Sequence, residues 1–374
     1  MASVVRHSRF VSNPFGDGAA KRSAQIEELL QQAGVVYVND EFALPKGMGF
    51  MTKLLWLLAG LRFVVAHFSW KEIRSIRNCL AMSKYFGLRM PLFETYKEKD
   101  VVFLNEDTTS SAYGFPYLAK EIGKKMLSLP HNMESLCCLG RDLQSGKPRL
   151  GWLSEDIIRL KLCDAVFCIS KEEMWLLSIH GVNAHYLPYY PPKVAEDYLL
   201  GVRKKRQGRN PNEICKFLIL GSASNEPTRQ GMDEVLSYFS SYGYLPFEIH
   251  VAGYRTECLE KKVHPQIVYH GTLSNDELEE MMIEVDALVI NQPATSGALT
   301  RIVEHLVAGI PVIASFGAAR DYYQSDDVQV FYSMDELMDL LKSFQCGEAV
   351  MPHRNNKAEQ RFVEWVRNSS KEKL

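Results

Sequence analysis

Apolar runs of strand length alternate with amphipathic segments of helix length along almost the whole chain. This alternation is typical of α/β proteins built on parallel sheets. Residues 19–32 place Ile26, Leu29 and Leu30 at helical spacing, which predicts a helix. In the first half of the chain we expect strands near Val4 and over residues 35–38, 101–104, 126–129 and 165–169.

The same rhythm restarts in the second half, where two helices are marked by capping boxes. Ser274 is followed three residues later by Glu277, and Ser333 by Glu336, a pattern that signals the start of a helix. A final helix around Phe362 needs an apolar surface to cover. The expected strands are residues 216–220, 247–251, 267–269, 287–290 and 311–314.

A break separates the two halves. Residues 189–212 contain two consecutive prolines, a basic run at 203–206, and then Gly208 and Pro211, which predicts a linker with a solvated basic loop. A chain of 374 residues is long enough for two domains of ordinary size. We therefore expect an α/β protein with two Rossmann-like, doubly wound domains that face each other across a cleft. The expected bounds are 1–190 and 213–352, with a linker at 191–212 and a C-terminal helix at 353–374 that can cross back to the first domain.

The overall composition narrows the class of protein. Hydrophobic residues make up 46% of the chain and charged residues 24%, which is the profile of a globular protein rather than a disordered one. The net charge of -2 argues against a nucleic-acid partner. The eight cysteines form no C-x-x-C pair, so we expect buried reduced thiols rather than disulfides or zinc ligands. No signal-peptide pattern opens the sequence, and we expect a cytoplasmic protein.

Charge is distributed unevenly along the chain. Residues 46–93 contain eight basic residues and a single acid, so this segment carries +7 whereas the rest carries -9. The segment also holds the most apolar run of the chain, residues 54–61, but Lys53, Arg62 and His67 make a transmembrane helix unfavourable. Two interpretations stay open: a helix that lies on an anionic membrane surface, or a buried core helix with basic neighbours.

The segment with the clearest chemistry is residues 295–314. A predicted strand leads into a turn that contains Gly297, and the helix that follows stops at Gly309 before the next strand. The turn lies at the carboxyl end of a parallel strand, where open α/β sheets bind ligands, and a helix N-terminus suits a diphosphate. Arg301 and Glu304 share a helix face, so a guanidinium could hold phosphate oxygens while a carboxylate accepts hydrogen bonds from ribose hydroxyls. An ordinary surface pair of arginine and glutamate is the alternative.

This segment resembles the donor-binding signature of the retaining glycosyltransferases with the GT-B fold, in particular the large family four. The resemblance implies that Glu304 binds the nucleotide ribose and that Arg301 lies near the diphosphate. It also implies that the donor contacts the turn made of Ser296, Gly297, Ala298, Leu299 and Thr300. The family has a second glutamate, which contacts the donor sugar, at the position of Ser296. The matching positions are Gly297, Arg301, Glu304, Ala308, Gly309, Pro311, Val312 and Ile313.

A histidine after a predicted strand fits the same family. His131 and Asn132 lie within the sequence Pro-His-Asn-x-Glu, directly after residues 126–129. Many family members have a comparable histidine there, close to the transferred sugar. The resemblance therefore implies that His131 is a catalytic residue and that Asn132 contacts the substrate. A structural histidine is the alternative.

Two glycine-containing turns complete the expected site. Gly16 and Gly18 form a loop before the first helix, where the absence of a side chain lets the backbone approach the donor or acceptor closely. Gly221 ends the first strand of the second domain. The family carries basic residues at and after this turn, and Arg229 is the nearest basic substitute here.

The reaction implied by the resemblance moves a sugar from a UDP- or GDP-linked donor to an acceptor hydroxyl, on a glycan or a lipid-linked glycan. Arg301, Arg229 and helix N–H groups would stabilise the charge that develops on the leaving diphosphate. We therefore expect no metal and no cofactor besides the nucleotide sugar. Retention of the anomeric configuration is implied by the resemblance alone.

Two other functions stay open. Gly16 and Gly18 open a helix and Asp40 ends the next strand, as in the dinucleotide fingerprint of NAD-dependent dehydrogenases, although Lys21 takes the place of the third glycine. The departure at Ser296 is also consistent with a non-catalytic protein that keeps the fold, such as an activator subunit of a glycosyltransferase complex.

Overall fold

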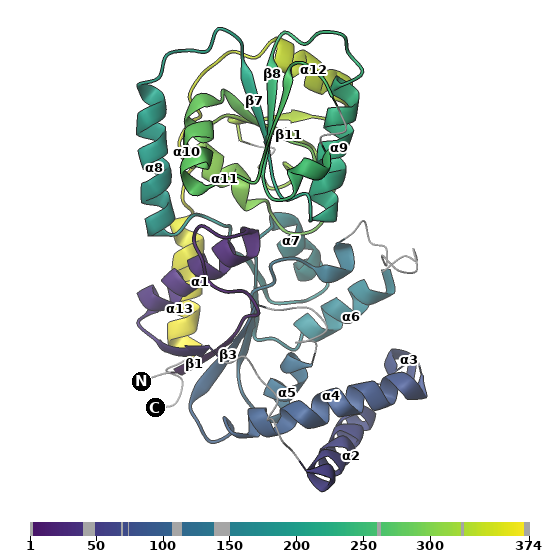
Figure 1. Cartoon of the computed structure of the whole chain (residues 1–374). Helices are drawn as coiled ribbons and strands as arrows, with labels where there is room; N and C mark the ends of the chain where they lie inside the picture. The colour runs from purple at the N-terminus through teal and green to yellow at the C-terminus, as the bar shows by residue number, and fades with distance from the viewer. Residues whose placement is uncertain are drawn as a thin grey trace.

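The computed structural model describes residues 3–39, 49–68, 70–73, 75–106, 114–137, 150–259, 263–322 and 325–369. It contains two parallel six-stranded sheets, one in each half of the molecule, with helices packed against them (Figure 1). The first sheet has the strand order β2-β1-β3-β4-β5-β6. Its strands are β1 (Ser3–His7), β2 (Val36–Asn39), β3 (Val101–Asn105), β4 (Met126–Ser128), β5 (Ala165–Cys168) and β6 (Ala184–Tyr186).

The second sheet has the order β12-β11-β10-β7-β8-β9. The sequence pattern missed one edge strand of each sheet, β6 and β12, because both are short and only partly apolar. In β12, only Val328 and Phe331 at the two ends are buried, so the strand lacks the continuous apolar run of a central parallel strand. The strands are β7 (Lys216–Leu220), β8 (Glu248–Ala252), β9 (Ile267–Gly271), β10 (Ala287–Ile290), β11 (Val312–Ser315) and β12 (Val328–Phe331). Two α/β sheets of this kind confirm the predicted fold class.

Local signals in the sequence set the ends of several helices. Asp17 accepts a hydrogen bond from the N–H of Ala20 and caps α1 (Gly18–Ala33), which ends at Gly34 in the left-handed conformation. The full capping box of Ser274 forms at the start of α10. The remaining helices over the sheets are α5 (Phe115–Glu121), α6 (Leu150–Leu160), α7 (Lys171–Ile179), α9 (Glu226–Phe239), α10 (Asn275–Glu284), α11 (Thr300–Val307) and α12 (Met334–Lys342), with 3-10 turns at Glu134–Leu136 and Thr256–Leu259.

The last helix, α13 (Asn356–Ser369), lies beside α1 of the first half, and the two contact each other (Figure 1). Phe362 is fully buried and packs edge-on against Phe167 of β5, with ring centroids 5.1 Å apart. The apolar surface that the sequence of α13 requires is therefore the first sheet and α1.

The segment between the sheets is a helix, which corrects the expectation of a solvated loop. Residues Lys193–Gln207 form α8, and its basic run holds the helix against the second sheet. Arg203 donates to the carbonyls of Leu306 and Val307, and buried Arg206 donates to those of Met282 and Val285. These are the last carbonyls of α11 and α10, where cationic donors are favourable.

Each sheet has a point where the strand order reverses direction. In the second sheet the chain leaves β7 toward β8 and β9, then returns to place β10 on the other side of β7. In the first sheet β1 lies between β2 and β3. Ligands of open α/β sheets bind at such points, outside the carboxyl ends of the strands. The segments that follow β1, β3, β7 and β10 are therefore the places to look for a site.

A helical hairpin projects from the first half, at the lower end of Figure 1. It consists of α2 (Phe50–His67), the short α3 (Trp70–Ile73) and α4 (Ile76–Glu94). The two long helices meet at Gly60 and Gly87. A Cβ on Gly60 would lie 2.7 Å from the backbone nitrogen of Gly87 and would overlap the carbonyl of Ser83, so only glycine permits this close crossing.

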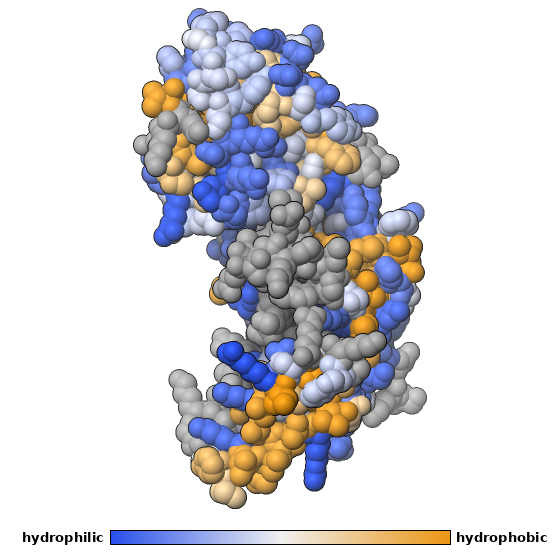
Figure 2. Space-filling view, turned by 90° about the vertical axis from the view of Figure 1, so that its right-hand side faces the viewer, coloured by the Kyte–Doolittle hydropathy of each residue, from blue (hydrophilic) through white to orange (hydrophobic). Residues whose placement is uncertain are grey.

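The outer face of this hairpin is apolar, and the interpretation of residues 54–61 as a core helix is wrong. Leu54, Leu55 and Leu58 are exposed, whereas only Gly60, Phe63 and Val64 of α2 are buried. Figure 2 shows the resulting orange surface at the lower end of the molecule. Of the helices in the described ranges, α2 alone is long and apolar enough to cross a membrane, by length and composition only.

The close crossing predicts a specific loss of stability. Replacing Gly60 by alanine should destabilise the protein by about 1–3 kcal/mol, because the added methyl group forces the helices apart. Thermal unfolding should report this as a lower Tm. Gly201→Ala is the matched control, since Gly201 is exposed in α8 with no atom near its Cβ position, and alanine should raise helix stability there by about 0.5–1 kcal/mol. Equal Tm values for Gly60→Ala and the wild type would contradict the packing.

Candidate functional site

A cleft of about 710 Å³ lies between the two sheets and is lined by residues of both halves. The lining comes from the segments that follow β1, β4, β7 and β10, and from the starts of α1, α9 and α11. Of its charged side chains, four are basic and one is acidic, so the cleft attracts anions. These charged residues are Asp17, Lys21, Arg22, Arg301 and Arg320.

Arg301 lies where β7 and β10 end. Its Nη1 donates to the carbonyl of Leu220 at 3.2 Å, and its Nη2 donates to Oε1 of Gln292 at 3.0 Å. The Nε atom is buried and has no hydrogen-bond partner. Gly221 makes room for this guanidinium, because a Cβ there would lie 2.7 Å from Nη1 of Arg301.

The charge of Arg301 has no counter-ion within the described part of the chain. Its half-buried guanidinium forms no ion pair, and burial together with the nearby Arg320 lowers its pKa to about 10. Arg320 donates to the carbonyls of Ser296, Gly297 and Gly317, so it is held by backbone oxygens rather than by a carboxylate contact. A partly buried cation without a counter-ion is less well solvated than in water, and a bound anion would relieve this.

Arg229 does not take part in this arrangement, which corrects the expectation from the sequence. Its side chain is about half exposed on the first turn of α9 and pairs with Glu226, with a nitrogen–oxygen distance of 2.5 Å. It is not among the residues that line the cleft. Arg320 supplies the second guanidinium instead. Sequence reasoning missed it because Arg320 lies 19 residues beyond Arg301, in the turn after β11, outside the motif.

On the first half's side, the loop before α1 forms one wall. Gly16 and Gly18 both line the cleft, and a Cβ on Gly18 would lie 3.3 Å from Oγ1 of Thr300, the first residue of α11. Arg22 is almost fully buried below this loop, and burial lowers its pKa to about 10. Its Nε and Nη2 atoms have no hydrogen-bond partner. A second set of unused donors therefore lies on the opposite wall from Arg301.

His131 is held by a buried network at the carboxyl ends of β1 and β3. Its Nε2 lies 3.3 Å from Oε2 of Glu106, and its ring stacks on Phe10 with centroids 4.5 Å apart. Because a carboxylate only accepts, this contact places the hydrogen on Nε2, and the buried Nδ1 has no partner. Glu106 also accepts from Nε of Arg6 at 2.6 Å and from the hydroxyl of Ser23 at 2.7 Å.

The turn before α11 docks on the first half. Gly297 has φ +79°, a conformation that favours glycine, and a Cβ there would lie 2.7 Å from the carbonyl oxygen of His131. The carboxylate of Glu173 accepts hydrogen bonds from the N–H groups of Gly297 and Met133, at 2.8 and 3.1 Å. Ser296 donates to the carbonyl of Met133 at 3.0 Å. The predicted donor turn and the His131 loop are thus in direct contact.

Glu304 also lies at the contact between the halves. Its Oε2 pairs with Nζ of Lys21 at 2.6 Å, and its Oε1 accepts from the hydroxyl of Tyr189 at 2.9 Å. The glutamate is buried and does not line the cleft, whereas Lys21 does. The predicted ribose contact therefore needs Lys21 to leave this carboxylate. The turn residues Ser296, Ala298, Leu299 and Thr300 line the cleft together with His131, Asn132 and Gly221.

No protein-family model and no curated protein match this chain. Solved structures do match it over its whole length. HepE from Anabaena, solved in complex with UDP, aligns with a TM-score of 0.60 at 11% identity, over 98% of both chains. The α,α-trehalose-6-phosphate synthase of Burkholderia multivorans aligns with a TM-score of 0.59 at 11% identity, over 99% of this chain and 92% of that one. A glycosyltransferase from Rickettsia africae aligns with a TM-score of 0.56 at 11% identity, over 99% of this chain and 93% of that one.

These similarities define the class of structure. Two Rossmann-like halves with a cleft between the carboxyl ends of their sheets are the GT-B fold, and the predicted fold is confirmed. At 11% identity these similarities establish the fold of this chain but not its activity or its ligands.

The His131 network predicts a pH dependence of stability. Burial alone would raise the pKa of Glu106, but Arg6 and His131 outweigh it and lower the pKa to about 2. This lies below the value of about 4.3 for an unfolded glutamate, so ionised Glu106 stabilises the fold above that pH, and the contribution is lost as pH falls toward 2. Glu106→Gln should lower Tm at neutral pH and flatten its decline below about pH 4. The exposed Glu364→Gln variant is the control, and a Glu106→Gln curve parallel to the wild type would contradict the network.

Proposed function

We propose that this protein is a glycosyltransferase that transfers a sugar from a nucleoside-diphosphate donor to an acceptor hydroxyl. The proposal rests above all on the guanidinium of Arg301 at the switch point of the second sheet, which has unused donor capacity and no counter-ion among the residues that the structure describes. A diphosphate supplies the missing negative charge and matches the fork of donors on an arginine. Arg320 and the start of α11 add to the same anion site.

The choice of nucleotide follows from the comparisons. HepE from Anabaena was solved with UDP, and also with UDP and glucose, and an Escherichia coli trehalose-6-phosphate protein was solved with UDP-2-fluoroglucose. The shared fold makes UDP the first donor nucleotide to test here, with GDP as the alternative. In our proposal the ribose reaches Glu304 once Lys21 has left that carboxylate.

The transfer breaks the bond between the anomeric carbon and the diphosphate oxygen and forms a bond from that carbon to the acceptor oxygen, whose proton passes to the leaving diphosphate. Negative charge then grows on the leaving diphosphate, and Arg301 and Arg320 stabilise it, so the chemistry needs no metal ion. His131 lies beside the sugar, with Glu106 fixing its orientation and protonation at Nε2. Docking of the turn that contains Gly297 onto the His131 loop keeps the halves close and limits the access of water. We include retention of the anomeric configuration in the proposal because the resemblance to family four implies it.

Two rival functions differ from this one in measurable ways. A dehydrogenase would use Gly16 and Gly18 for a dinucleotide, but Gly18 faces Thr300 at the start of α11, and Asp40 lies outside the described residues. A non-catalytic subunit would bind the nucleotide and leave a nucleotide sugar intact. Donor turnover by the purified protein separates the second rival from an enzyme.

The anion site predicts how nucleotide affinity depends on Arg301. Arg301→Met should weaken binding of UDP, or of GDP if the wild type binds that nucleotide, by about 1.5–3 kcal/mol, because hydrogen bonds to a charged group are lost. Glu304→Ala should weaken it by roughly 1–3 kcal/mol if the ribose reaches this carboxylate. Isothermal titration calorimetry measures both.

Arg229→Met is the matched control, since it removes an exposed guanidinium outside the cleft, and its affinity should equal that of the wild type. If Arg301→Met keeps wild-type affinity for the nucleotide, the diphosphate does not bind at this position.

We also propose that the α2–α4 hairpin docks on the cytoplasmic surface of an anionic membrane, where the acceptor is lipid-linked or membrane-proximal. Its exposed apolar side chains include Phe50, Leu55, Trp70 and Ile76. Exposed basic residues are interspersed with them, namely Lys53, Arg62, Arg77 and Lys84, and no exposed acid lies on the described part of α2 or on α4 before Glu94. Apolar burial and attraction to anionic headgroups would act together on this face.

The membrane proposal predicts binding that depends on lipid charge and on salt. The protein should co-sediment with phosphatidylglycerol vesicles at low salt, less at high salt, and poorly with neutral vesicles, because exposed charges are screened over about 8–10 Å near physiological ionic strength. Arg62→Glu with Arg77→Glu should reduce the bound fraction. Lys204→Glu with Lys357→Glu changes the net charge equally on exposed helix positions elsewhere and should bind like the wild type. No sedimentation at low salt would contradict membrane docking.

A further inference from the structure

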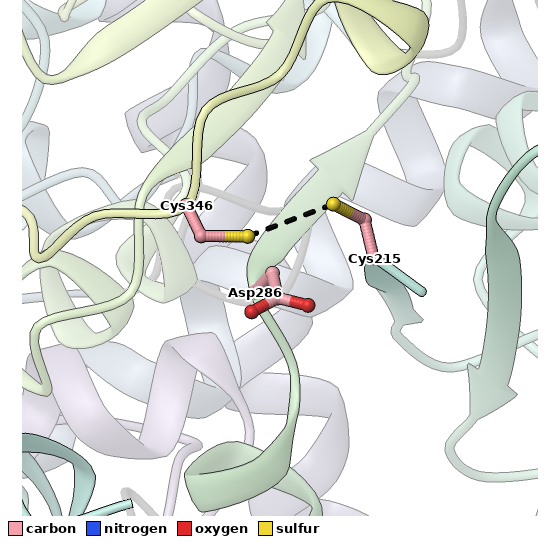
Figure 3. Close-up of side chains that lie close together, drawn as sticks. All are labelled: Cys215, Asp286 and Cys346. Atoms are coloured by element: carbon pink, nitrogen blue, oxygen red, sulfur yellow. Dashed lines mark hydrogen bonds between the residues drawn. The ribbon is translucent and has the colours of Figure 1, made fainter. Parts of the chain in front are cut away.

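Three side chains with metal-ligating atoms meet at the amino ends of the strands of the second sheet, on the side away from the cleft. Cys215 precedes β7, Asp286 precedes β10, and Cys346 follows α12 (Figure 3). One ligand atom from each lies within 4.8 Å of the others. The cleft lies at the opposite, carboxyl ends of β7 and β10, at Gly221 and Gln292. The cluster is therefore separate from the proposed active site, and it has no part in the function proposed above.

The spacing of the two sulfurs fits a shared cation. The Sγ atoms of Cys215 and Cys346 are 3.6 Å apart, whereas a disulfide bond measures about 2.05 Å. Two thiolates on a tetrahedral zinc ion, each with a Zn–S distance of about 2.3 Å, lie about 3.8 Å apart. The observed separation is close to this value.

The carboxylate of the cluster is held in place by its own hydrogen bonds. Asp286 is fully buried; its Oδ1 pairs with Arg209 at 2.5 Å, and its Oδ2 accepts from Asn212 at 2.8 Å and from the N–H of Lys216 at 2.9 Å. A carboxylate has about four lone-pair positions, so these contacts leave capacity for a cation. Ligating carboxylates in metal sites are commonly fixed by such surrounding partners.

Charge is balanced in the metal-bound form. Once both thiols have lost their protons, two thiolates and one carboxylate carry a charge of -3, which a divalent ion together with Arg209 balances. A cation that binds here displaces one proton from each thiol, as thiolate ligation requires.

We propose that Cys215, Asp286 and Cys346 form a structural site for one thiophilic divalent cation of the zinc class, with a water molecule as the fourth ligand. The ion would tie the starts of β7 and β10 to the segment that leads from α12 to α13. The chain passes between the halves twice, before α8 and again between α12 and α13, which packs on the first half. This site would fix the second of these connections. The sequence alone does not reveal the site, because its two cysteines are 131 residues apart.

A cobalt titration of the full chain tests this proposal. The reduced protein, freed of metal with a chelator, should take up one equivalent of Co²⁺ and develop a thiolate-to-cobalt charge-transfer band, which Zn²⁺ then removes. Cys215→Ser and Cys346→Ser should each weaken Co²⁺ binding by about tenfold or more. Cys258→Ser is the matched control, since this exposed cysteine lies outside the cluster, and it should behave like the wild type. Zinc should also raise the Tm of the wild type but not of the Cys215→Ser variant.

Two results would overturn the proposal. One is a wild type without the charge-transfer band, or with a band that persists in the Cys215→Ser, Cys346→Ser double variant. The other is a wild type that binds no Co²⁺ but loses two hydrogens in mass when treated with a small-molecule disulfide, which would identify the pair as a disulfide-forming site instead. Neither result depends on glycosyltransferase activity.

Discussion

The guanidinium of Arg301 is the feature on which the rest of the cleft depends. Holding a cation partly out of water without a counter-ion opposes folding, and within the described ranges its hydrogen-bond acceptors are the neutral atoms Leu220 O and Gln292 Oε1. Gly221 leaves space for it, and Arg320 adds a second positive charge nearby rather than a compensating negative one. Because the arrangement is unfavourable without an anion, the binding of an anion lowers the free energy of the protein. That is the physical reason for placing a diphosphate at this point.

The geometry around the anion site follows from the way the two halves meet. Both sheets present their switch points to the same cleft, and a glycine turn contributes to the contact beside it, together with an apolar cluster that joins Ile169 and Tyr189 to the second half. Gly297 can approach the backbone of His131 because it has no side chain, and Glu173 binds backbone N–H groups from both halves. The ion pair of Lys21 with Glu304 closes the same contact from the other side. In the proposed function, a ribose that binds Glu304 would have to compete with this ion pair.

Much of the fold could be predicted from the sequence, because local patterns determine it. Apolar runs located ten of the strands, Ser274 and Ser333 marked helix starts, and one motif placed Arg301 and the turn before it at the cleft. The features that could not be predicted from the sequence depend on side-chain contacts that sequence patterns do not encode. Arg320 joins the site through the turn after β11. Arg203 and Arg206 of α8 donate to carbonyls at the ends of two other helices, and Arg229 pairs with its own neighbour Glu226. The exposure of Leu55 and Leu58 depends on the close crossing of α2 and α4. The Cys215–Cys346 cluster depends on the packing of two segments that are 131 residues apart in the sequence.

The central claim is that this cleft activates a nucleoside-diphosphate sugar through protein cations alone. Incubation of the purified protein with a panel of UDP- and GDP-linked sugars, without added Mg²⁺, tests it most directly, with release of UDP or GDP as the quantity measured. We expect slow donor hydrolysis, faster release when a suitable acceptor is present, and no increase on addition of Mg²⁺. Tight nucleotide binding with every donor left intact would contradict catalysis, and release that strictly requires Mg²⁺ would contradict the role assigned to Arg301 and Arg320.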